Sequence, residues 1–210
     1  GFVTMLGGVS VVMALCLTAR CDYGFFEALT LSAFNVTSIV TTTGFASTDY
    51  TLWGPFAIMA FFLLTFLGGC TGSTSGGLKM FRLQILAILF KTQVRQTLYP
   101  HVAQTMRYGE RTVNREIVFS VALFVFVFMG SILVAALAIA AFGVDFTTAL
   151  SSSAQAFANV GPGLGPIVGP AGNFSSLPDG PKLILAFAML LGRLELLTIL
   201  VMFSKDYWER

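Results

Sequence analysis

A long uncharged run, Ile117 to Phe142, constrains the fold of this chain more than any other feature. It exceeds the roughly 20 apolar residues that a helix needs to cross the hydrocarbon core of a bilayer. Phe2 to Ala19 is just long enough, and Leu183 to Phe203 spans as well. Only 10% of the residues are charged, against about 25% in soluble domains. Because so little polar surface remains to face water, the sequence predicts a multi-pass membrane protein.

A further apolar run is interrupted by glycine. Trp53 to Leu67 rises only about 22 Å as a helix, which is too short to span a bilayer. The next residues, 68–77, read Gly-Gly-Cys-Thr-Gly-Ser-Thr-Ser-Gly-Gly, and a second apolar stretch begins at Met80. We therefore expect one inner helix over 53–90 that is interrupted at 68–77 inside the membrane.

Two shorter segments, 25–40 and 146–158, mix apolar residues with Ser, Thr and Asn. Each is followed by a polar stretch that contains glycine, at 41–46 and 159–163. One such segment alone would favour a short spanning helix rich in Ser and Thr. Two of them favour re-entrant pore helices, which enter and leave the membrane on one side.

The same order of elements occurs twice: a long helix, a short helix, a glycine-bearing turn and a second long helix. The central glycines, Gly44 and Gly161, are 117 residues apart (161 − 44), and internal repeats are typical of transport proteins. We predict an all-α integral membrane fold of two helix–pore-helix–helix repeats, the first with a broken inner helix. The predicted boundaries are a first repeat at 1–90 (outer helix 2–19, pore helix 25–40, filter 41–46, inner helix 53–90), a linker at 91–115, and a second repeat at 116–210 (outer helix 117–142, pore helix 146–158, filter 159–163, inner helix 183–204).

Basic residues predict the orientation of the chain. Lys and Arg outnumber acidic residues between Lys79 and Arg115, and cytoplasmic loops carry such an excess. We therefore expect the linker to be cytoplasmic and both turns to lie on the outer side. His101, the only histidine, falls in this linker, and one histidine cannot make a metal site. The chain begins at Gly1 within an apolar run, so we expect it to be a piece of a longer protein.

The two glycine-bearing turns have the chemistry of a cation site. Irregular backbone at membrane depth occurs only where it is buried in protein or lines a watery cavity. Carbonyl oxygens exposed there can replace the hydration shell of a potassium ion. Glycine lets successive carbonyls point at one axis, and the C-terminal end of each pore helix favours a cation.

Both turns share the central glycine of the Thr-Val-Gly-Tyr-Gly filter of potassium channels. Thr42, Thr43 and Asn159 have an alternative role, in which their side chains only brace the turns. The candidate filter residues are Thr42, Thr43, Gly44, Phe45, Asn159, Val160, Gly161 and Pro162. The candidate K⁺ ligands among them are Thr43, Gly44, Val160 and Gly161.

The sequence Gly-Gly-Cys-Thr-Gly-Ser-Thr-Ser-Gly-Gly-Leu-Lys at 68–79 resembles the interrupted inner helix of the Trk/Ktr/HKT family of potassium transporters. It follows one candidate filter and precedes another, and Arg193 lies in Gly-Arg-Leu-Glu, as in the bacterial members. The resemblance covers essentially the whole chain and is to the third and fourth repeats of a four-repeat subunit. It implies one pore with a filter glycine from each repeat, here Gly44 and Gly161.

The resemblance also implies a gate and partners. The glycine-rich break would be an intramembrane gating loop, two subunits would form a homodimer, and a cytoplasmic nucleotide-binding ring of the TrkA/KtrA type would dock on them. Two of the four repeats are missing, so this chain alone should not conduct unless two copies assemble one pore. The candidate gating residues are Gly68, Gly69, Gly72, Gly76, Gly77, Lys79 and Arg193.

Arg193 is the most informative of these residues, because a charged side chain at mid-bilayer costs at least about 2.5–3.5 kcal/mol on insertion scales. We hypothesise that it faces the pore, touches carbonyls of the 68–77 loop and holds the closed state. A buried ion pair that fixes helix packing is the alternative, although Glu195 lies on a different helix face. The glycines of 68–77 have an alternative role too, in which they let helices approach closely. A phosphate-binding loop is disfavoured, because Leu78 separates its last glycine from Lys79.

The function predicted from these features is gated K⁺ uptake across the inner membrane of a bacterium. K⁺ is the transported ion, membrane lipid surrounds the chain, and no covalent cofactor or nucleic-acid partner is expected. A non-conducting half that supports a partner is one alternative. A membrane-embedded enzyme that modifies lipids is another, but the sequence offers no well-placed general base and no catalytic set, so we expect no enzyme activity.

Overall fold

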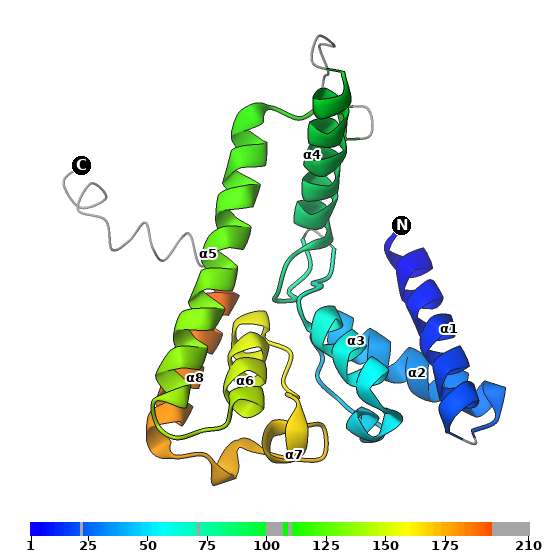
Figure 1. The fold of residues 1–210 in the computed structure, drawn as a ribbon, viewed down its shortest axis with the longest axis vertical. Helices are drawn as coiled ribbons and strands as arrows, with labels where there is room; N and C mark the ends of the chain where they lie inside the picture. The colour runs from blue at the N-terminus through cyan, green and yellow to red at the C-terminus, as the bar shows by residue number, and fades with distance from the viewer. Residues whose placement is uncertain (22, 71, 100–106, 109–110, 195–210) are drawn as a thin grey trace.

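The computed structural model describes residues 1–21, 23–70, 72–99, 107–108 and 111–194. Nearly all of its regular structure is helical, and the strands within these ranges are two short segments. The helices form two groups that lie side by side, joined by a central segment and by the long helix α4 (Met80–Leu98), which meets the upper part of α5 (Arg115–Ala140), a helix of the second group (Figure 1). These groups correspond to the two halves of the sequence.

The first group contains α1 (Phe2–Arg20), α2 (Phe25–Val40), the 3₁₀ turn η1 (Tyr50–Trp53) and α3 (Pro55–Thr65). Helix α3 begins directly after Gly54, with Pro55 in its first turn, where a missing N–H has no effect on the helix. Tyr50 stacks on Phe61 with ring centroids 4.1 Å apart, and both side chains are buried. This aromatic contact fixes the return of the chain from the first turn to α3.

The second group contains α5 (Arg115–Ala140), α6 (Phe146–Ala158), α7 (Gly165–Val168), the 3₁₀ turn η2 (Phe174–Ser176) and α8 (Asp179–Arg193). Helix α6 packs against both α5 and α8, and Phe157 meets Phe128 edge-on across this contact. All residues of α6 from Thr148 to Ala158 are buried except Leu150. Most of these residues are Ala, Ser or Thr, and their small side chains allow the neighbouring helices to pack closely against α6. The second turn therefore starts from a rigid, enclosed helix.

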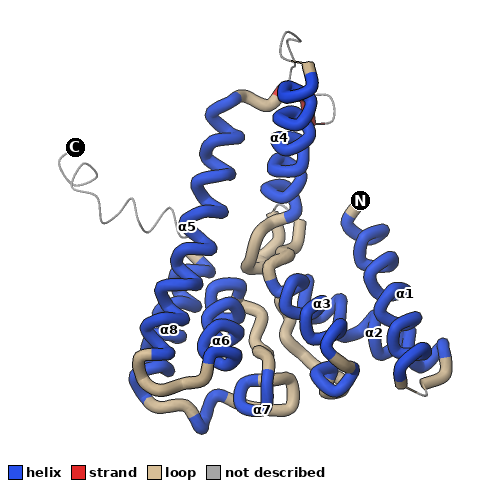
Figure 2. The backbone as a smooth tube through the Cα atoms, viewed as in Figure 1, coloured by secondary structure: helices blue, strands red, loops and turns tan. Residues whose placement is uncertain are grey.

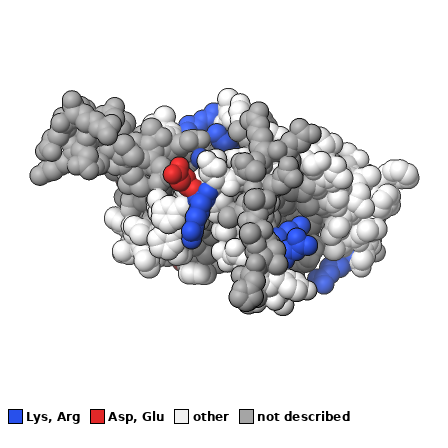
Figure 3. All heavy atoms as spheres, turned by 90° about the horizontal axis from the view of Figure 1, so that it is seen from above, with Lys and Arg blue, Asp and Glu red and all other residues white. Residues whose placement is uncertain are grey.

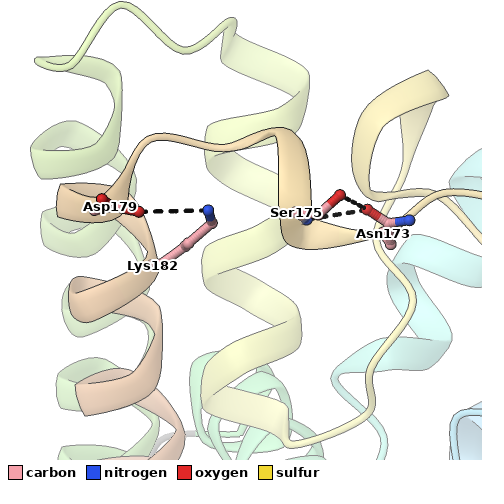
Figure 4. A network of polar contacts seen from close by, with 4 residues as sticks. All are labelled: Asn173, Ser175, Asp179 and Lys182. Atoms are coloured by element: carbon pink, nitrogen blue, oxygen red, sulfur yellow. Dashed lines mark hydrogen bonds and ion pairs between the residues drawn. The ribbon is translucent and has the colours of Figure 1, made fainter.

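The approach to α8 is ordered by short-range polar contacts (Figure 4). Asn173 Oδ1 accepts a hydrogen bond of 3.0 Å from the Ser175 backbone N–H and another from the Ser175 hydroxyl. Lys182 Nζ lies 3.5 Å from Asp179 Oδ1, one turn apart on the helix. Asp179 also places a negative charge at the N-terminus of α8, where it interacts favourably with the positive end of the helix dipole.

Between the groups the chain leaves the helical conformation from residue 66 to residue 79, a segment that we name the central loop. It lies between α3 and α4 (Met80–Leu98) and appears as a loop between the two groups in Figure 2. Beyond α4, β1 (Arg107–Tyr108) pairs antiparallel with β2 (Arg111–Thr112). The Tyr108 hydroxyl donates to Gln84 Oε1 at 2.7 Å, which ties this hairpin to α4.

Two helices among the described residues, α1 and α5, are long and apolar enough to cross a membrane. The outward side of α5 is apolar as well: Phe126, for example, is 77% exposed. Water would be a poor solvent for such a surface, and lipid is a suitable one. Helices α2 and α3 are apolar but shorter.

The structure shifts several helix ends by one or two residues, so that the inner helix starts at Pro55 instead of 53 and α5 covers Arg115–Ala140 instead of 117–142. Three further differences concern the break, the linker and the last helix. The break in the inner helix covers 66–79 instead of 68–77, because Leu67 and Leu78 pair through their backbones at the neck of the loop. Helix α4 continues to Leu98, inside the predicted linker, since Lys, Gln and Arg are good helix formers. Helix α8 begins at Asp179, earlier than the predicted 183. The later part of that predicted helix, 195–204, lies outside the described residues, and so does His101.

Candidate functional site

The turns that follow α2 and α6 have the same backbone geometry. Thr42 has a φ of 57° and Asn159 a φ of 54°, left-handed values that are uncommon for residues other than glycine. Two residues later, Gly44 has a φ of 80° and Gly161 a φ of 124°. Both pairs are separated by 117 residues (159 − 42 and 161 − 44), so the repeat seen in the sequence is a repeat of conformation.

The two turns lie against each other. A Cβ placed on Gly44 would lie 2.1 Å from the carbonyl oxygen of Val160. A Cβ placed on Gly161 would lie 3.7 Å from the Cα of Gly44. Glycine is thus required at position 44 for close approach as well as for its positive φ. The fold brings both candidate filter glycines to one place.

Helices α2 and α6 each hold the turn that follows them through a residue near the helix C-terminal end. The Ser38 carbonyl accepts from the N–H of Thr43 at 2.9 Å and of Gly44 at 3.4 Å. In the second repeat the Gln155 carbonyl accepts from the N–H of Val160 at 3.2 Å, and its side-chain Oε1 accepts from the N–H of Gly161 at 3.1 Å. These bonds occupy N–H groups and leave the turn carbonyls available as ligands.

The segment that returns from each turn is held by a buried polar side chain. Asn35 Nδ2 donates to Ser47 Oγ at 2.8 Å, and Asn35 Oδ1 accepts from Ser47 N at 3.2 Å. Ser151 Oγ accepts from Leu164 N at 3.1 Å. Ser47 and Leu164 are again 117 residues apart (164 − 47). Sequence reasoning missed Asn35, Ser151 and Gln155, although a buried amide or hydroxyl within an apolar helix is itself a signal that a partner exists.

The central loop is closed at its neck and ordered inside. Gly68 N donates to the Leu78 carbonyl at 2.8 Å, and Leu78 N donates to the Phe66 carbonyl at 3.0 Å. Within the loop, Ser75 Oγ accepts from Gly69 N at 2.8 Å and lies 2.7 Å from Ser73 Oγ. The break therefore has a defined shape, which is what a closing element requires.

This loop lies directly against the two turns. Gly76 N donates to Thr42 Oγ1 at 3.3 Å. A Cβ on Gly76 would lie 2.2 Å from the Ala158 carbonyl, at the end of α6. Carbonyls at the C-terminal end of a helix carry its partial negative charge, so the loop covers the negative end of α6.

Arg193 reaches the loop from α8. Its Nη1 donates a hydrogen bond to the Thr74 carbonyl, so the predicted contact with a loop carbonyl is present. Arg193 lines a cavity of about 170 Å³, and Arg82 lies over the Phe124 ring at 3.7 Å in its wall. The lining residues are Ser73, Thr74, Ser75, Gly76, Gly77, Lys79, Arg82, Phe124, Gly192 and Arg193. Glu195, the alternative partner considered for Arg193, lies outside the described residues.

The remaining candidates differ in their surroundings. Val160 is buried, whereas Phe45 is 70% exposed and Thr43 is exposed. Pro162 approaches Gly44, with its Cδ 3.4 Å from a Cβ placed there. Gly72 lies at the exposed tip of the loop. The described residues contain no cluster of His, Cys, Asp or Glu that could hold a metal ion, so carbonyl and hydroxyl oxygens are the cation ligands that this site offers.

Comparisons with known proteins agree with this geometry. Residues 22–210 match the family model of TrkH, a cation transport protein. The Trk system potassium uptake protein TrkI of Halomonas elongata is 49% identical over 88% of this chain and 38% of its own length. TrkH of Salmonella typhimurium is 35% identical over 99% of this chain and 43% of its own length. The crystal structure of the potassium transporter TrkH from Vibrio parahaemolyticus superposes with a TM-score of 0.91 at 30% identity, over 99% of this chain and 44% of that one.

The chain thus spans less than half the length of these relatives. They are potassium transporters and not enzymes, which removes the lipid-modifying enzyme as an alternative. The resemblance inferred from the broken helix, the two glycine turns and Arg193 is confirmed by the family match. The chain belongs to the TrkH family of cation transport proteins.

Proposed function

We propose that this chain supplies two of the four filter segments, and the gate beneath them, of a protein that takes up K⁺ through a pore. The observation that carries the proposal is the conformational repeat. Two turns with left-handed Thr42 and Asn159, and with positive-φ Gly44 and Gly161, lie in contact at the ends of two pore helices. The names of the relatives, potassium uptake proteins, indicate the ion.

In this proposal the main-chain carbonyls of Thr43, Gly44, Val160 and Gly161 coordinate K⁺. A ring of carbonyls replaces the water that the ion gives up on entry, and both pore helices direct their negative ends toward the ion. Thr42, Phe45, Asn159 and Pro162 complete the two segments. Two segments cannot encircle an ion, so the other two come from a region that this chain does not contain or from a second copy.

The central loop serves as the gate in its closed position. Gly76 lies against both turns, and the Arg193–Thr74 hydrogen bond holds the loop from the side of α8. Gly68, Gly69, Gly72 and Gly77 give the loop its tight path, and Lys79 ends it at the start of α4. Because Arg193 holds the loop through its charge and a hydrogen bond to the Thr74 carbonyl, its removal frees the loop.

The surroundings follow from the same scheme. The chain lies in the inner membrane of a bacterium as a multi-pass protein in contact with lipid, and two complete subunits form a homodimer. A nucleotide-binding ring of the TrkA/KtrA type docks on the cytoplasmic end, where α4 and α5 meet. Lys and Arg side chains are visible in several places at that end (Figure 3), in keeping with the excess of basic residues on the cytoplasmic side.

The test is uptake of radioactive rubidium into proteoliposomes, competed by K⁺ or Na⁺. We would compare this chain alone with a chimera in which it replaces the matched region of TrkH from Vibrio parahaemolyticus. Uptake by the chimera only, blocked better by K⁺, is the expected result. Uptake by the chain alone would mean that two copies complete the filter. A folded chimera with no uptake in the presence of its cytoplasmic partner would overturn the proposal and favour a supporting, non-conducting role.

Arg193 offers the sharpest test of the gate. Arg193→Ala in the chimera is expected to raise rubidium flux, because the loop loses its hydrogen bond to α8. Arg193→Lys keeps the charge and is expected to give an intermediate flux, since lysine lacks the fixed fork of the guanidinium. Unchanged flux with lowered thermal stability would show that Arg193 only supports packing.

A further inference from the structure

We propose that Gly76 couples the gate to the filter, so that the position of the central loop and the ion preference of the filter change together. The inference rests on the proposed function, since it concerns how that gate is regulated. It assigns a positioning role to Thr42, whose hydroxyl accepts the Gly76 N–H at 3.3 Å across 34 residues of sequence. Thr42 thus acts through the loop, in addition to any contact with an ion.

Gly76 is the loop glycine that meets the filter. A Cβ on Gly76 would lie 2.2 Å from the Ala158 carbonyl and 3.0 Å from Asn159 Cβ. By contrast, the nearest atoms to Cβ positions on Gly68 and Gly69 belong to the loop itself and its neck. No described atom lies within 4 Å of such a position on Gly72. One residue of the loop therefore contacts both turns at once.

Helix α8 completes a closed path of contacts. Asn159 Nδ2 donates to the Met189 carbonyl at 3.2 Å, and a Cβ on Gly192 would lie 2.1 Å from the Phe157 carbonyl. Arg193, the next residue, binds the loop at Thr74. The loop is thus joined to the first turn through Thr42, and to the second through α8.

The consequence is a reciprocal linkage. If the loop leaves its closed position, Thr42 loses a hydrogen-bond donor at a backbone position that is already left-handed and strained. Its carbonyl and that of Thr43 are then free to reorient. By linkage, a filter conformation that retains the Thr42–Gly76 bond also favours the closed loop. An uncoupled gate would change flux and leave ion preference the same.

The experiment compares the effect of Arg193→Ala on ion preference in three forms of the chimera: unchanged at residue 42, Thr42→Val and Thr42→Ser. Val keeps the branched shape and loses the acceptor, and Ser keeps the acceptor. Rubidium uptake competed by K⁺ and by Na⁺ gives the preference in each case. We expect Arg193→Ala to lower the preference for K⁺ by about fivefold or more, the lower end of usual coupling, in the unchanged and Thr42→Ser forms but not in the Thr42→Val form.

Because the comparison is of the change caused by Arg193→Ala, any direct role of Thr42 in binding the ion cancels. Gly76→Ala is a second route, since its methyl group displaces the loop from the Ala158 carbonyl. Gly76→Ala is expected to raise flux and lower preference together. If Arg193→Ala and Gly76→Ala raise flux at constant preference, or leave both unchanged, the coupling is wrong while the pore itself stands. Absence of uptake by the unsubstituted chimera would instead refute the proposed function.

Discussion

The turns that follow α2 and α6 share a backbone conformation but differ in the hydrogen bonds that support it. In the first turn, one carbonyl, that of Ser38, receives the N–H groups of both Thr43 and Gly44. In the second, Gln155 divides the same task between its carbonyl and its side-chain amide oxygen. In both turns, the same two backbone N–H groups are hydrogen-bonded to the preceding helix. The groups that accept these hydrogen bonds differ between the two turns.

The turns also differ in how firmly they are enclosed. Val160 is 4% exposed and lies in a hydrophobic cluster made mostly by the first group, whereas Phe45, the residue after Gly44, is 70% exposed. The first turn receives the hydrogen bond from the loop, through Thr42. The second turn continues from α6, which is enclosed by α5 and α8. The helix that leads into the second turn is thus enclosed on two sides, and the first turn is the one hydrogen-bonded to the central loop.

The largest difference between the turns is expected from alanine at the two glycines. Both substitutions place a Cβ at a positive φ, at about 1–3 kcal/mol of strain. Gly44→Ala adds an overlap with the Val160 carbonyl at 2.1 Å, whereas Gly161→Ala meets its nearest atom at 3.7 Å. Gly44→Ala should abolish selective rubidium uptake by the chimera, and Gly161→Ala should weaken K⁺ preference while uptake persists. Equal losses at both positions would show that strain alone decides the outcome.

The second contrast concerns the side chains that hold the returning segments. Asn35 makes two hydrogen bonds to Ser47 and one of 2.8 Å to the Leu31 carbonyl, and it is fully buried. Asn35→Ala should lower the free energy of unfolding by about 3 kcal/mol, because several buried groups lose partners together. Ser151→Ala removes two hydrogen bonds to the Leu164 backbone, one of 3.1 Å from its N–H and a longer one of 3.4 Å to its carbonyl, and should cost about 1–2 kcal/mol. Unfolding in detergent measures both, and a larger loss for Ser151→Ala would contradict the expectation that the number of buried hydrogen bonds sets the cost.

Sequence reasoning predicted the two short helices and the Arg193 contact because the signals for them are local. Apolar length and the glycine after each short helix predicted segments 25–40 and 146–158, which α2 and α6 cover residue for residue. The cost of a charge in an apolar helix made Arg193 conspicuous and led to its contact with a loop carbonyl. Such features follow from the residue itself and its near neighbours.

The parts that sequence reasoning missed depend on where distant segments meet. Nothing local marks Gly76, among several glycines, as the one that touches both turns. Gln155 and Asn35 read as ordinary polar residues of a mixed segment until their partners at Gly161 and Ser47 are known. The widening of the break to 66–79 follows from backbone pairing across the neck, which also requires the folded loop.

A smaller difference is expected between Ser38 and Gln155, the two residues that accept hydrogen bonds from the N–H groups of the turns. Gln155→Ala leaves the Gly161 N–H without its acceptor and should cost about 2 kcal/mol. Ser38 acts through its carbonyl, and its buried hydroxyl has no hydrogen-bond partner among the described residues. Ser38→Ala should therefore be neutral or slightly stabilising, with K⁺ preference unchanged. A loss of preference in the Ser38 variant would indicate that its hydroxyl has a partner in the assembled pore.

The smallest effect is expected where the pore helices begin. Asp145 caps α6 by accepting the Thr148 N–H at 3.0 Å, and α2 begins at Gly24, which has no side chain to do so. Asp145→Ala should lower the free energy of unfolding by about 1 kcal/mol. Gly24 has an extended conformation with open space around it, so Gly24→Asp should raise the free energy of unfolding by a few tenths of a kcal/mol.

The Asp145 cap also has a pH signature. Hydrogen bonds from Thr148 lower the pKa of the Asp145 carboxyl below its usual value. A group with a lowered pKa in the folded state stabilises fully above its unfolded pKa, about 4, and loses that contribution as the pH falls through the folded value. The difference in thermal stability between the parent chain and Asp145→Ala should therefore be present at neutral pH and should shrink below about pH 4. A stability difference that stays constant down to that pH would mean that the charge of Asp145 contributes nothing to the cap. The N-terminal ends of α2 and α6 would then differ less in capping energy than the residues Gly24 and Asp145 indicate.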